Sequence, residues 1–362
     1  MNTLDLTSQL LIALSLLGLV GWVGWRLWPS KALRPQGQEP LDPSVEPELA
    51  AVTGAAATGE SDLEPDITAI DHYNEAVRRE NAGDPAAALA SYDQALAQDP
   101  GLVEAWNNRG LILEDQGRFQ EALQSFEQAL RQQPDFFVAC FNRANCLRQL
   151  DRLTEARLAY ERALTLGPDS PETWFGHGLT LARLGDLEGS LASYDKALAL
   201  NAADPEIWYR RGLVLSKLDR PDDALDSYAQ SLSRDPQQAQ VWASQGIGQL
   251  RQRSLMEAVE SLDRSLELDP KQPRLWIYRG IAMGELGFDA LAIEDFDRAL
   301  AWDPNSGEAH YQKACTLVQQ EKLQEALSAL HRALELEFDT YRARLEQDPL
   351  LAVLRDALGD LG

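Results

Sequence analysis

The sequence predicts an all-α superhelix, a solenoid of eight 34-residue helix-turn-helix repeats followed by a C-terminal capping helix. The first observation is a period of 34 residues that runs from Ala69 to Thr340 without insertion or deletion. The second is that each copy contains two amphipathic helical patterns, joined at a turn residue such as Gly117 and often ended by a proline such as Pro134. Such an array grows in one dimension without needing one large core.

Five columns of residues define the repeat. The first holds a large side chain: His72, Trp106, Cys140, Trp174, Trp208, Trp242, Trp276 and His310. A small residue follows four places later: Ala76, Gly110, Ala144, Gly178, Gly212, Gly246, Gly280 and Ala314. The second helix carries two small columns and an aromatic column, the latter being Tyr92, Phe126, Tyr160, Tyr194, Tyr228, Leu262, Phe296 and Leu330. We expect the tryptophans to be buried and to dominate stability, so that Trp208→Ala costs about 3–5 kcal/mol.

An apolar run precedes the repeats. After a short tail at residues 1–9, residues 10–28 span roughly 28 Å as a helix, close to the thickness of a hydrocarbon core. No basic residue precedes the run and no small-residue cleavage site follows it, which favours a retained transmembrane helix over a cleaved signal. Arg26, Lys31 and Arg34 flank only its C-terminal side, which predicts an external N-terminus and a cytoplasmic array, as in a bacterial inner membrane. Gly18, Gly21 and Gly24 leave a weak homodimer through this helix as a possibility.

The remaining boundaries follow from composition. Residues 29–66 form an acidic, proline-rich segment with few large apolar side chains, which predicts a disordered linker. The repeats occupy 69–102, 103–136, 137–170, 171–204, 205–238, 239–272, 273–306 and 307–340. Residues 341–362 break the pattern and are predicted to form one capping helix over the end of the stack.

Charge and cysteine content exclude several functions. A net charge of -24 argues against general nucleic-acid binding. Three cysteines do not make a disulfide framework, and Cys140 in the large-residue column is expected to be a buried thiol. No metal-ligand spacing, phosphate-binding loop or nucleophile motif is present, so the sequence predicts no cofactor, no metal and no enzymatic activity.

The period, the Trp-x-x-x-Gly pattern and the alanine and aromatic columns resemble the tetratricopeptide repeat family, over about three quarters of the chain. The resemblance implies helix pairs stacked in a right-handed superhelix, whose inner surface is lined by the first helices and binds peptides or partner proteins. It also implies that the second, fifth, sixth, ninth, twelfth and thirteenth residues of each repeat line the groove. One departure is Arg253, which stands at the position of the turn glycine.

The seventh residue of each repeat and the residue after the aromatic column carry opposite charges when successive repeats are compared. The predicted ion pairs are Asp93–Arg109, Glu127–Arg143, Glu161–His177, Asp195–Arg211, Asp263–Arg279 and Asp297–Lys313. The exception is Ala229 with Gln245, at the junction of repeats five and six, where Gly246 and Gly248 also weaken the docking helix. We therefore expect this to be the weakest junction.

Three sets of residues are candidates for the groove. Asn74, Asn108 and Asn142 share the sixth position, and their carboxamides could bind an extended peptide backbone or be ordinary polar surface. Arg183, Lys217 and Arg251 share the thirteenth position with Arg210 nearby, which favours either an acidic ligand segment or neutralisation of neighbouring carboxylates. Aromatic residues stand where some family members carry a lysine and asparagine set that clamps a terminal carboxylate, namely Tyr73, Phe141, Phe175 and Tyr209.

The sequence therefore predicts a membrane-anchored scaffold that binds an extended peptide or partner protein in its groove. The alternative is a regulatory or substrate-recruiting subunit of an enzyme complex whose catalytic part is on another chain. No nucleic-acid partner is expected.

Overall fold

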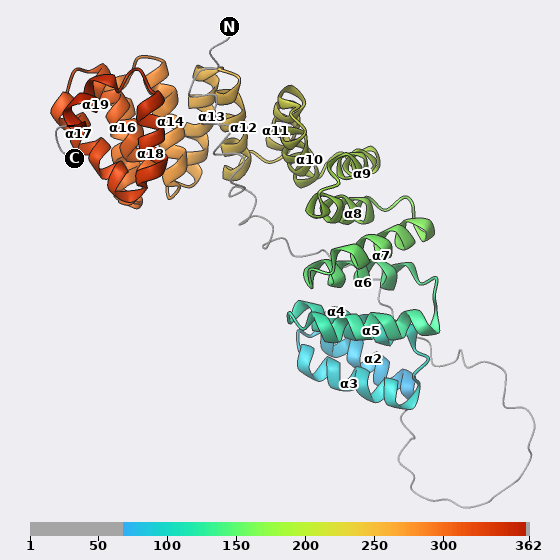
Figure 1. The fold of residues 1–362 in the computed structure, drawn as a ribbon. Helices are drawn as coiled ribbons and strands as arrows, with labels where there is room; N and C mark the ends of the chain where they lie inside the picture. Colours follow the sequence, from blue (N-terminus) through green and yellow to red (C-terminus); the bar gives the residue numbers. More distant parts are fainter. Residues whose placement is uncertain (1–67, 360–362) are drawn as a thin grey trace, which may run out of the picture. The chain divides into compact units, whose positions relative to one another are not determined.

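The computed structural model describes residues 68–359, and in this range the chain forms helices α2 to α19 and no strand (Figure 1). The predicted tail, transmembrane helix and linker, at 1–9, 10–28 and 29–66, lie outside the described residues. None of the helices in the described range is both long and apolar enough to span a bilayer.

Every repeat begins at the residue that the period predicts. The first helices are α2 (Ala69–Asn81), α4 (Val103–Asp115), α6 (Phe137–Gln149), α8 (Pro171–Leu184), α10 (Pro205–Lys217), α12 (Ala239–Arg251), α14 (Pro273–Glu285) and α16 (Gly307–Gln319). The second helices are α3 (Pro85–Gln98), α5 (Phe119–Gln132), α7 (Leu153–Leu166), α9 (Leu187–Leu200), α11 (Pro221–Arg234), α13 (Leu255–Leu268), α15 (Asp289–Trp302) and α17 (Leu323–Leu336). In each repeat the two helices pack side by side (Figure 1).

The described chain divides into two compact units, one ending at Leu200 and the other beginning at Asn201. The boundary therefore falls after the fourth repeat. The junction of repeats five and six, which the sequence predicts to be the weakest, lies inside the second unit. Its relative stability stays a prediction for hydrogen exchange.

The turn inside each repeat has one left-handed residue. Four of these positions are glycine, including Gly117 at φ 73°. In the other repeats Asp151, Asp219, Arg253 and Glu321 adopt the same conformation, with φ between 56° and 65°. The turn then closes with a backbone bond across six residues, as from Arg118 N–H to the Leu113 carbonyl at 2.8 Å. Side chains at these positions cost stability because only glycine adopts positive φ freely.

The aromatic column forms the centre of each repeat. Tyr92, Phe126 and Tyr160 are completely buried. The small column makes room for these rings: a Cβ added to Gly110 would lie 2.6 Å from the Phe126 ring, which is too close. In repeat six Leu262 takes the ring's place, 2.8 Å from a Cβ added to Gly246.

The expectation that the tryptophans of the first column are buried is wrong. The tryptophans are only partly buried, and the indole N–H donates to a carbonyl six residues earlier, as from Trp106 to Pro100 at 2.9 Å. They therefore pack on the loop between repeats, and we expect truncation of the buried aromatic column to cost more. Cys140 is buried in the same column, as predicted.

The C-terminal region also differs from its prediction. Residues 341–362 do not form one helix, because α18 (Phe338–Gln347) directly follows α17 and α19 (Ala352–Gly359) is separate. Tyr341 stacks on Tyr311 at 5.4 Å, and Leu351 and Leu354 are buried in the same cluster. Because α18 and α19 are separate helices, both can cover apolar residues of the last repeat.

Candidate functional site

The first helices of neighbouring repeats lie parallel, displaced by one residue. Contacts between them join residues that are 35 apart: Asn107 with Asn142, and Arg148 with Arg183, in the first unit. In the second unit Tyr209 and Ser244 are related in the same way. The first helices of each unit therefore present one continuous face, which is the predicted groove surface.

Two of the three candidate asparagines lie inside the protein. Asn108 and Asn142 have no exposed surface. Asn108 Nδ2 donates to the Tyr73 hydroxyl at 3.3 Å, Asn107 Nδ2 donates to Asn108 Oδ1 at 3.3 Å, and Asn142 Nδ2 donates to Asn107 Oδ1 at 3.1 Å. These amides link α2, α4 and α6 to one another. A peptide could bind them only by replacing these bonds, whereas Asn74 is partly exposed.

The four aromatic candidates are core residues. Tyr73, Phe141, Phe175 and Tyr209 are each less than 10% exposed. Each packs against the second-helix aromatic of its own repeat, with ring centroids 5.9, 6.2, 5.8 and 6.1 Å apart. This packing stabilises the repeat and leaves little of these rings at the surface.

Two of the four residues in the predicted basic set form ion pairs. Arg183 pairs with Asp151 at 2.5 Å, and the nearly buried Arg210 pairs with Glu206 at 2.5 Å. Burial raises the pKa of Glu206 and Arg210 lowers it, with burial the larger effect. Lys217 is exposed. Arg251 is exposed at the end of α12, and its guanidinium has no hydrogen bond or ion pair within residues 68–359.

Residues that the sequence did not single out complete this part of the surface. Gln240 and Ser244 lie on α12 on the same helical face as Arg251, and Arg274 and Tyr278 lie on the adjacent α14. Gln240 and Arg274 are exposed. Arg274 and Tyr278 occupy the second and sixth positions of repeat seven, which the family resemblance assigns to the groove, so position alone could have identified them.

The predicted ion pairs form at four junctions. Arg109 Nε donates to Asp93 at 2.7 Å, Arg143 lies 3.5 Å from Glu127, Lys313 lies 2.5 Å from Asp297, and Arg279 bonds Asp263. Asp195 and Arg211 belong to different compact units, so their pairing stays a prediction. The Glu161–His177 prediction is wrong, since Glu161 pairs with Arg157 at 3.1 Å and His177 Nδ1 lies 3.0 Å from the Ser193 hydroxyl.

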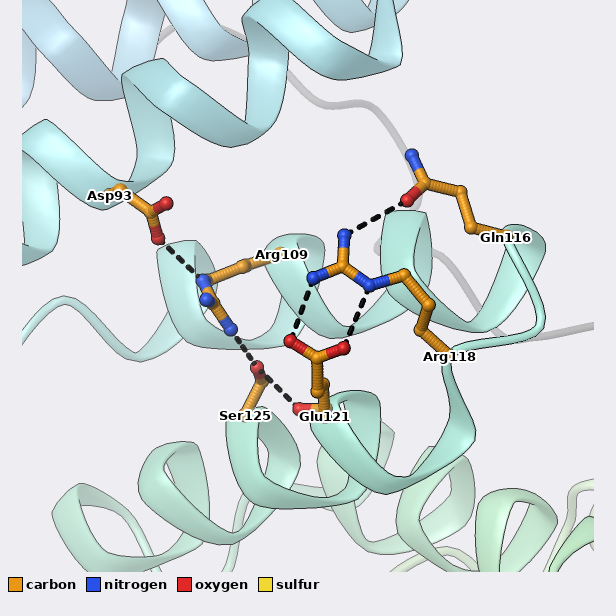
Figure 2. A network of polar contacts seen from close by, with 6 residues as sticks. All are labelled: Asp93, Arg109, Gln116, Arg118, Glu121 and Ser125. Atoms are coloured by element: carbon orange, nitrogen blue, oxygen red, sulfur yellow. Dashed lines mark hydrogen bonds and ion pairs between the residues drawn. The ribbon is translucent and has the colours of Figure 1, made fainter.

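A second contact of the seventh-position residue was not predicted. Figure 2 shows Arg109 between Asp93 of the preceding repeat and Ser125 of its own repeat, whose hydroxyl accepts at 2.7 Å. Arg211 donates to Ser227 at 2.7 Å in the same way. In repeat seven the serine is replaced by Asp295, which bonds Arg279 at 2.6 Å. The seventh-position side chain therefore joins two repeats and also the two helices of one repeat.

At the junction of repeats five and six this contact is missing. Ala229 and Gln245 occupy the two positions, and Gln245 Oε1 is buried without a hydrogen bond in the described chain. The face of the last repeat is occupied in another way: Arg344 of α18 binds Glu308 at 2.6 Å, and the Tyr311 hydroxyl donates to Asp348 at 3.2 Å. In the second unit the exposed candidate residues of the first-helix face therefore lie on α12 and α14, together with Lys217 at the end of α10.

Comparison with known proteins agrees with this fold. Tetratricopeptide repeat models match residues 73–135, 113–171, 178–219, 205–238, 244–309 and 307–340. No curated protein matches the chain.

Several solved structures are similar. One is YrrB, described as a TPR protein with an unusual peptide-binding site: identity is 21%, the TM-score is 0.48, and the match covers 52% of this chain and 96% of that one. A second is a tetratricopeptide repeat protein from Parabacteroides merdae, with 17% identity, a TM-score of 0.49 and coverage of 70% and 98%. A third is MamA from Desulfovibrio magneticus, with 19% identity, a TM-score of 0.45 and coverage of 47% and 96%.

Proposed function

Because the chain belongs to the tetratricopeptide repeat family, we propose that it is a protein-interaction scaffold whose first-helix face binds an extended segment of a partner. The observation that supports this proposal is the contrast between buried and accessible polar groups on that face. The side chains of Asn108 and Asn142 are buried and already hydrogen-bonded within the protein. In contrast, Gln240 and Arg251 on α12 and Arg274 on α14 are exposed. The partner therefore binds in the second unit, at repeats six and seven.

Site-specific photo-crosslinking of the full chain tests the binding face. A photoreactive amino acid at Gln240 should yield a covalent adduct with a partner in the producing cells. The same amino acid at Glu260, an exposed residue of α13 on a second helix, is the matched control and should yield none. Equal adducts from both positions, or adducts from Glu260 alone, would place the interaction elsewhere. If the captured partner is an enzyme, the chain is its recruiting subunit.

We also propose that residues 10–28 anchor the scaffold in a membrane, with the repeats on the cytoplasmic side. The support is the apolar run with its basic C-terminal flank. Membrane fractions of cells that produce the full chain should retain the protein against high salt and release it into detergent. A variant lacking residues 1–28 should move to the soluble fraction. Release of the full chain by salt alone would contradict the anchor.

A further inference from the structure

Arginine pairing separates a few residues from all the others. In residues 68–359 nearly every guanidinium has a hydrogen bond or an ion pair, as expected in a chain with 57 acidic and 33 basic residues. The exceptions are Arg131, Arg162, Arg251 and Arg274, for which the described residues supply neither. An arginine that stays unpaired amid excess carboxylates needs an explanation.

Two of these arginines are isolated and two lie together. Arg131 and Arg162 are exposed on α5 and α7, which are second helices of the first unit. Arg251 is the last residue of α12 and Arg274 is the second residue of α14, and these first helices are in contact. Tyr278 lies one turn beyond Arg274 on the same face of α14.

Tyr278 is the third polar residue at this position of the first-helix face. Its side chain is 8% exposed, and its hydroxyl has no hydrogen-bond partner among residues 68–359. Burial raises the pKa of Tyr278; the positive charges of Arg274 and Arg251 act to lower it, and the negative charge of Glu308 acts to raise it. Arg274 lies one turn before Tyr278 on α14, and Arg251 lies on the neighbouring α12.

The carboxylates near this surface already have partners. Glu308 of α16 is held by Arg344 at 2.6 Å. Glu285 of α14 pairs with Arg253 at 3.0 Å. Neither carboxylate pairs with Arg251 or Arg274, so both guanidiniums remain available to a ligand.

Between the cations, Ser244 of α12 turns its hydroxyl back to the Gln240 carbonyl at 2.9 Å. A Cβ added to Gly248 would lie 3.0 Å from Leu225 of α11, so this glycine packs against the preceding repeat. Residues 35 apart are level on adjacent first helices, so Arg274 is level with Ala239, twelve residues before Arg251. The Cα atoms of Arg251 and Arg274 therefore differ by roughly 18 Å along the helix axes. That length corresponds to about five residues of extended chain. Two carboxylates on one extended segment fit it better than a single terminal carboxylate.

We propose that Arg251, Arg274 and the Tyr278 hydroxyl form a subsite that binds the side-chain carboxylates of an extended acidic segment in a partner polypeptide. The guanidiniums pair with two carboxylates, and the hydroxyl donates to one of them or to the peptide carbonyl between them. This inference rests on the proposed function and names the chemistry of the partner. Arg183 and Arg210, which share the sequence signal, take no part because Asp151 and Glu206 neutralise them.

Calorimetric titration of the full chain with hexaglutamate, acetylated and amidated at its ends, tests the subsite. At low ionic strength we expect binding that weakens as salt is added. Arg251→Glu with Arg274→Glu should weaken it by about tenfold or more, the effect of losing two partly exposed charge pairs. Tyr278→Phe should weaken it by roughly twofold to fivefold.

The other unpaired arginines supply the control. Arg131→Glu with Arg162→Glu changes the net charge of the chain equally and should leave the affinity within about twofold. An equal loss in this control would mean that the added negative charge weakens binding by general repulsion, and would overturn the subsite. Absence of binding to the unchanged protein would overturn it as well.

Two further results separate the alternatives. Hexaserine with a free carboxyl end should not bind, and its binding in place of blocked hexaglutamate would show a terminal-carboxylate site instead. Circular dichroism and thermal unfolding of the double glutamate variant should match those of the unchanged protein, which confirms that the variant is folded. If crosslinks form from Gln240 while hexaglutamate fails to bind, the scaffold function stands and the acidic partner is wrong.

Discussion

The first-helix face has the same backbone structure in repeats two and three as in repeats six and seven, but its polar side chains differ in burial and in hydrogen bonding. In α4 and α6 the polar residues of the first-helix face, Asn107, Asn108 and Asn142, satisfy one another and are completely buried. In α12 and α14 the corresponding face carries Arg251 and Arg274, which have no partner within residues 68–359. A polar residue on this face therefore stabilises the stack or remains available for binding, depending on its neighbour one repeat away. The following changes test that contrast.

The buried amides should give the largest effect. Asn142→Ala leaves the buried side-chain oxygen Oδ1 of Asn107 without its hydrogen-bond donor. We therefore expect the free energy of unfolding to fall by about 2–3 kcal/mol. The matched control is Ser244→Ala, the same sixth position in repeat six, which should change it by less than about 0.5 kcal/mol. Urea denaturation measures both. Equal losses would show that the two regions do not differ.

The small column offers a second contrast. Gly110→Ala places a methyl group 2.6 Å from the rigid Phe126 ring and should destabilise the protein by about 2 kcal/mol. Gly246→Ala meets Leu262 at 2.8 Å. The Leu262 side chain can move, but the Ala258 carbonyl oxygen at 3.2 Å belongs to the backbone. The gain in helix propensity offsets part of the cost, so we expect a loss below about 1 kcal/mol. Thermal unfolding that ranks the two variants in the reverse order would refute this account of the aromatic column.

Asp295 makes the stability of repeat seven depend on pH, at the position where repeat two has the uncharged Ser125. Burial raises the pKa of Asp295 to about 6, partly offset by Arg279, so the folded state binds a proton more tightly than the unfolded state. Stability is therefore greatest below pH 3.8 for this group and falls as pH rises towards 6. The variant Asp295→Ser copies Ser125. As pH rises from 3.8 to 6, its free energy of unfolding should increase by roughly 1–2 kcal/mol relative to that of the unchanged protein. A constant difference across pH would contradict this.

The turn of repeat six carries strain that the turn of repeat two avoids. Arg253 has φ 65° and Gly117 has φ 73°. Arg253→Gly should raise the free energy of unfolding by about 1 kcal/mol, whereas Gly117→Ala should lower it by a similar amount. Arg253 also pairs with Glu285 at 3.0 Å. Lysine at this position, which keeps the charge and the strain, should therefore show no gain.

Restoring the missing ion pair should have the smallest effect. Ala229→Asp and Gln245→Arg together copy Asp93 and Arg109, which bond at 2.7 Å. A double-mutant cycle should show a favourable coupling of about 0.5–1 kcal/mol, typical of a partly exposed pair. Hydrogen exchange in α12 should slow at the same time. A coupling of zero would mean that this junction has a geometry different from the others.

The sequence by itself determined the repeat frame and much of its chemistry. A strict period fixes where each helix begins, because a polar or apolar stripe specifies one helical face. It also identified the four ion pairs that form and the departure at Arg253, because charges and turn residues recur in columns. It did not identify Asp151, Asp219 and Glu321 as left-handed, because no signal except the missing glycine marks them.

Only the tertiary structure decided which polar residues are accessible. Asn108 and Arg251 both lie on the first-helix face in the sequence, yet one is buried and the other exposed. The reason is that burial and hydrogen bonding depend on residues 35 positions away and on their rotamers, which one-dimensional columns do not contain. The same reason explains the partly exposed tryptophans, the neutralised Arg183 and Arg210, and the open pair Arg251 and Arg274.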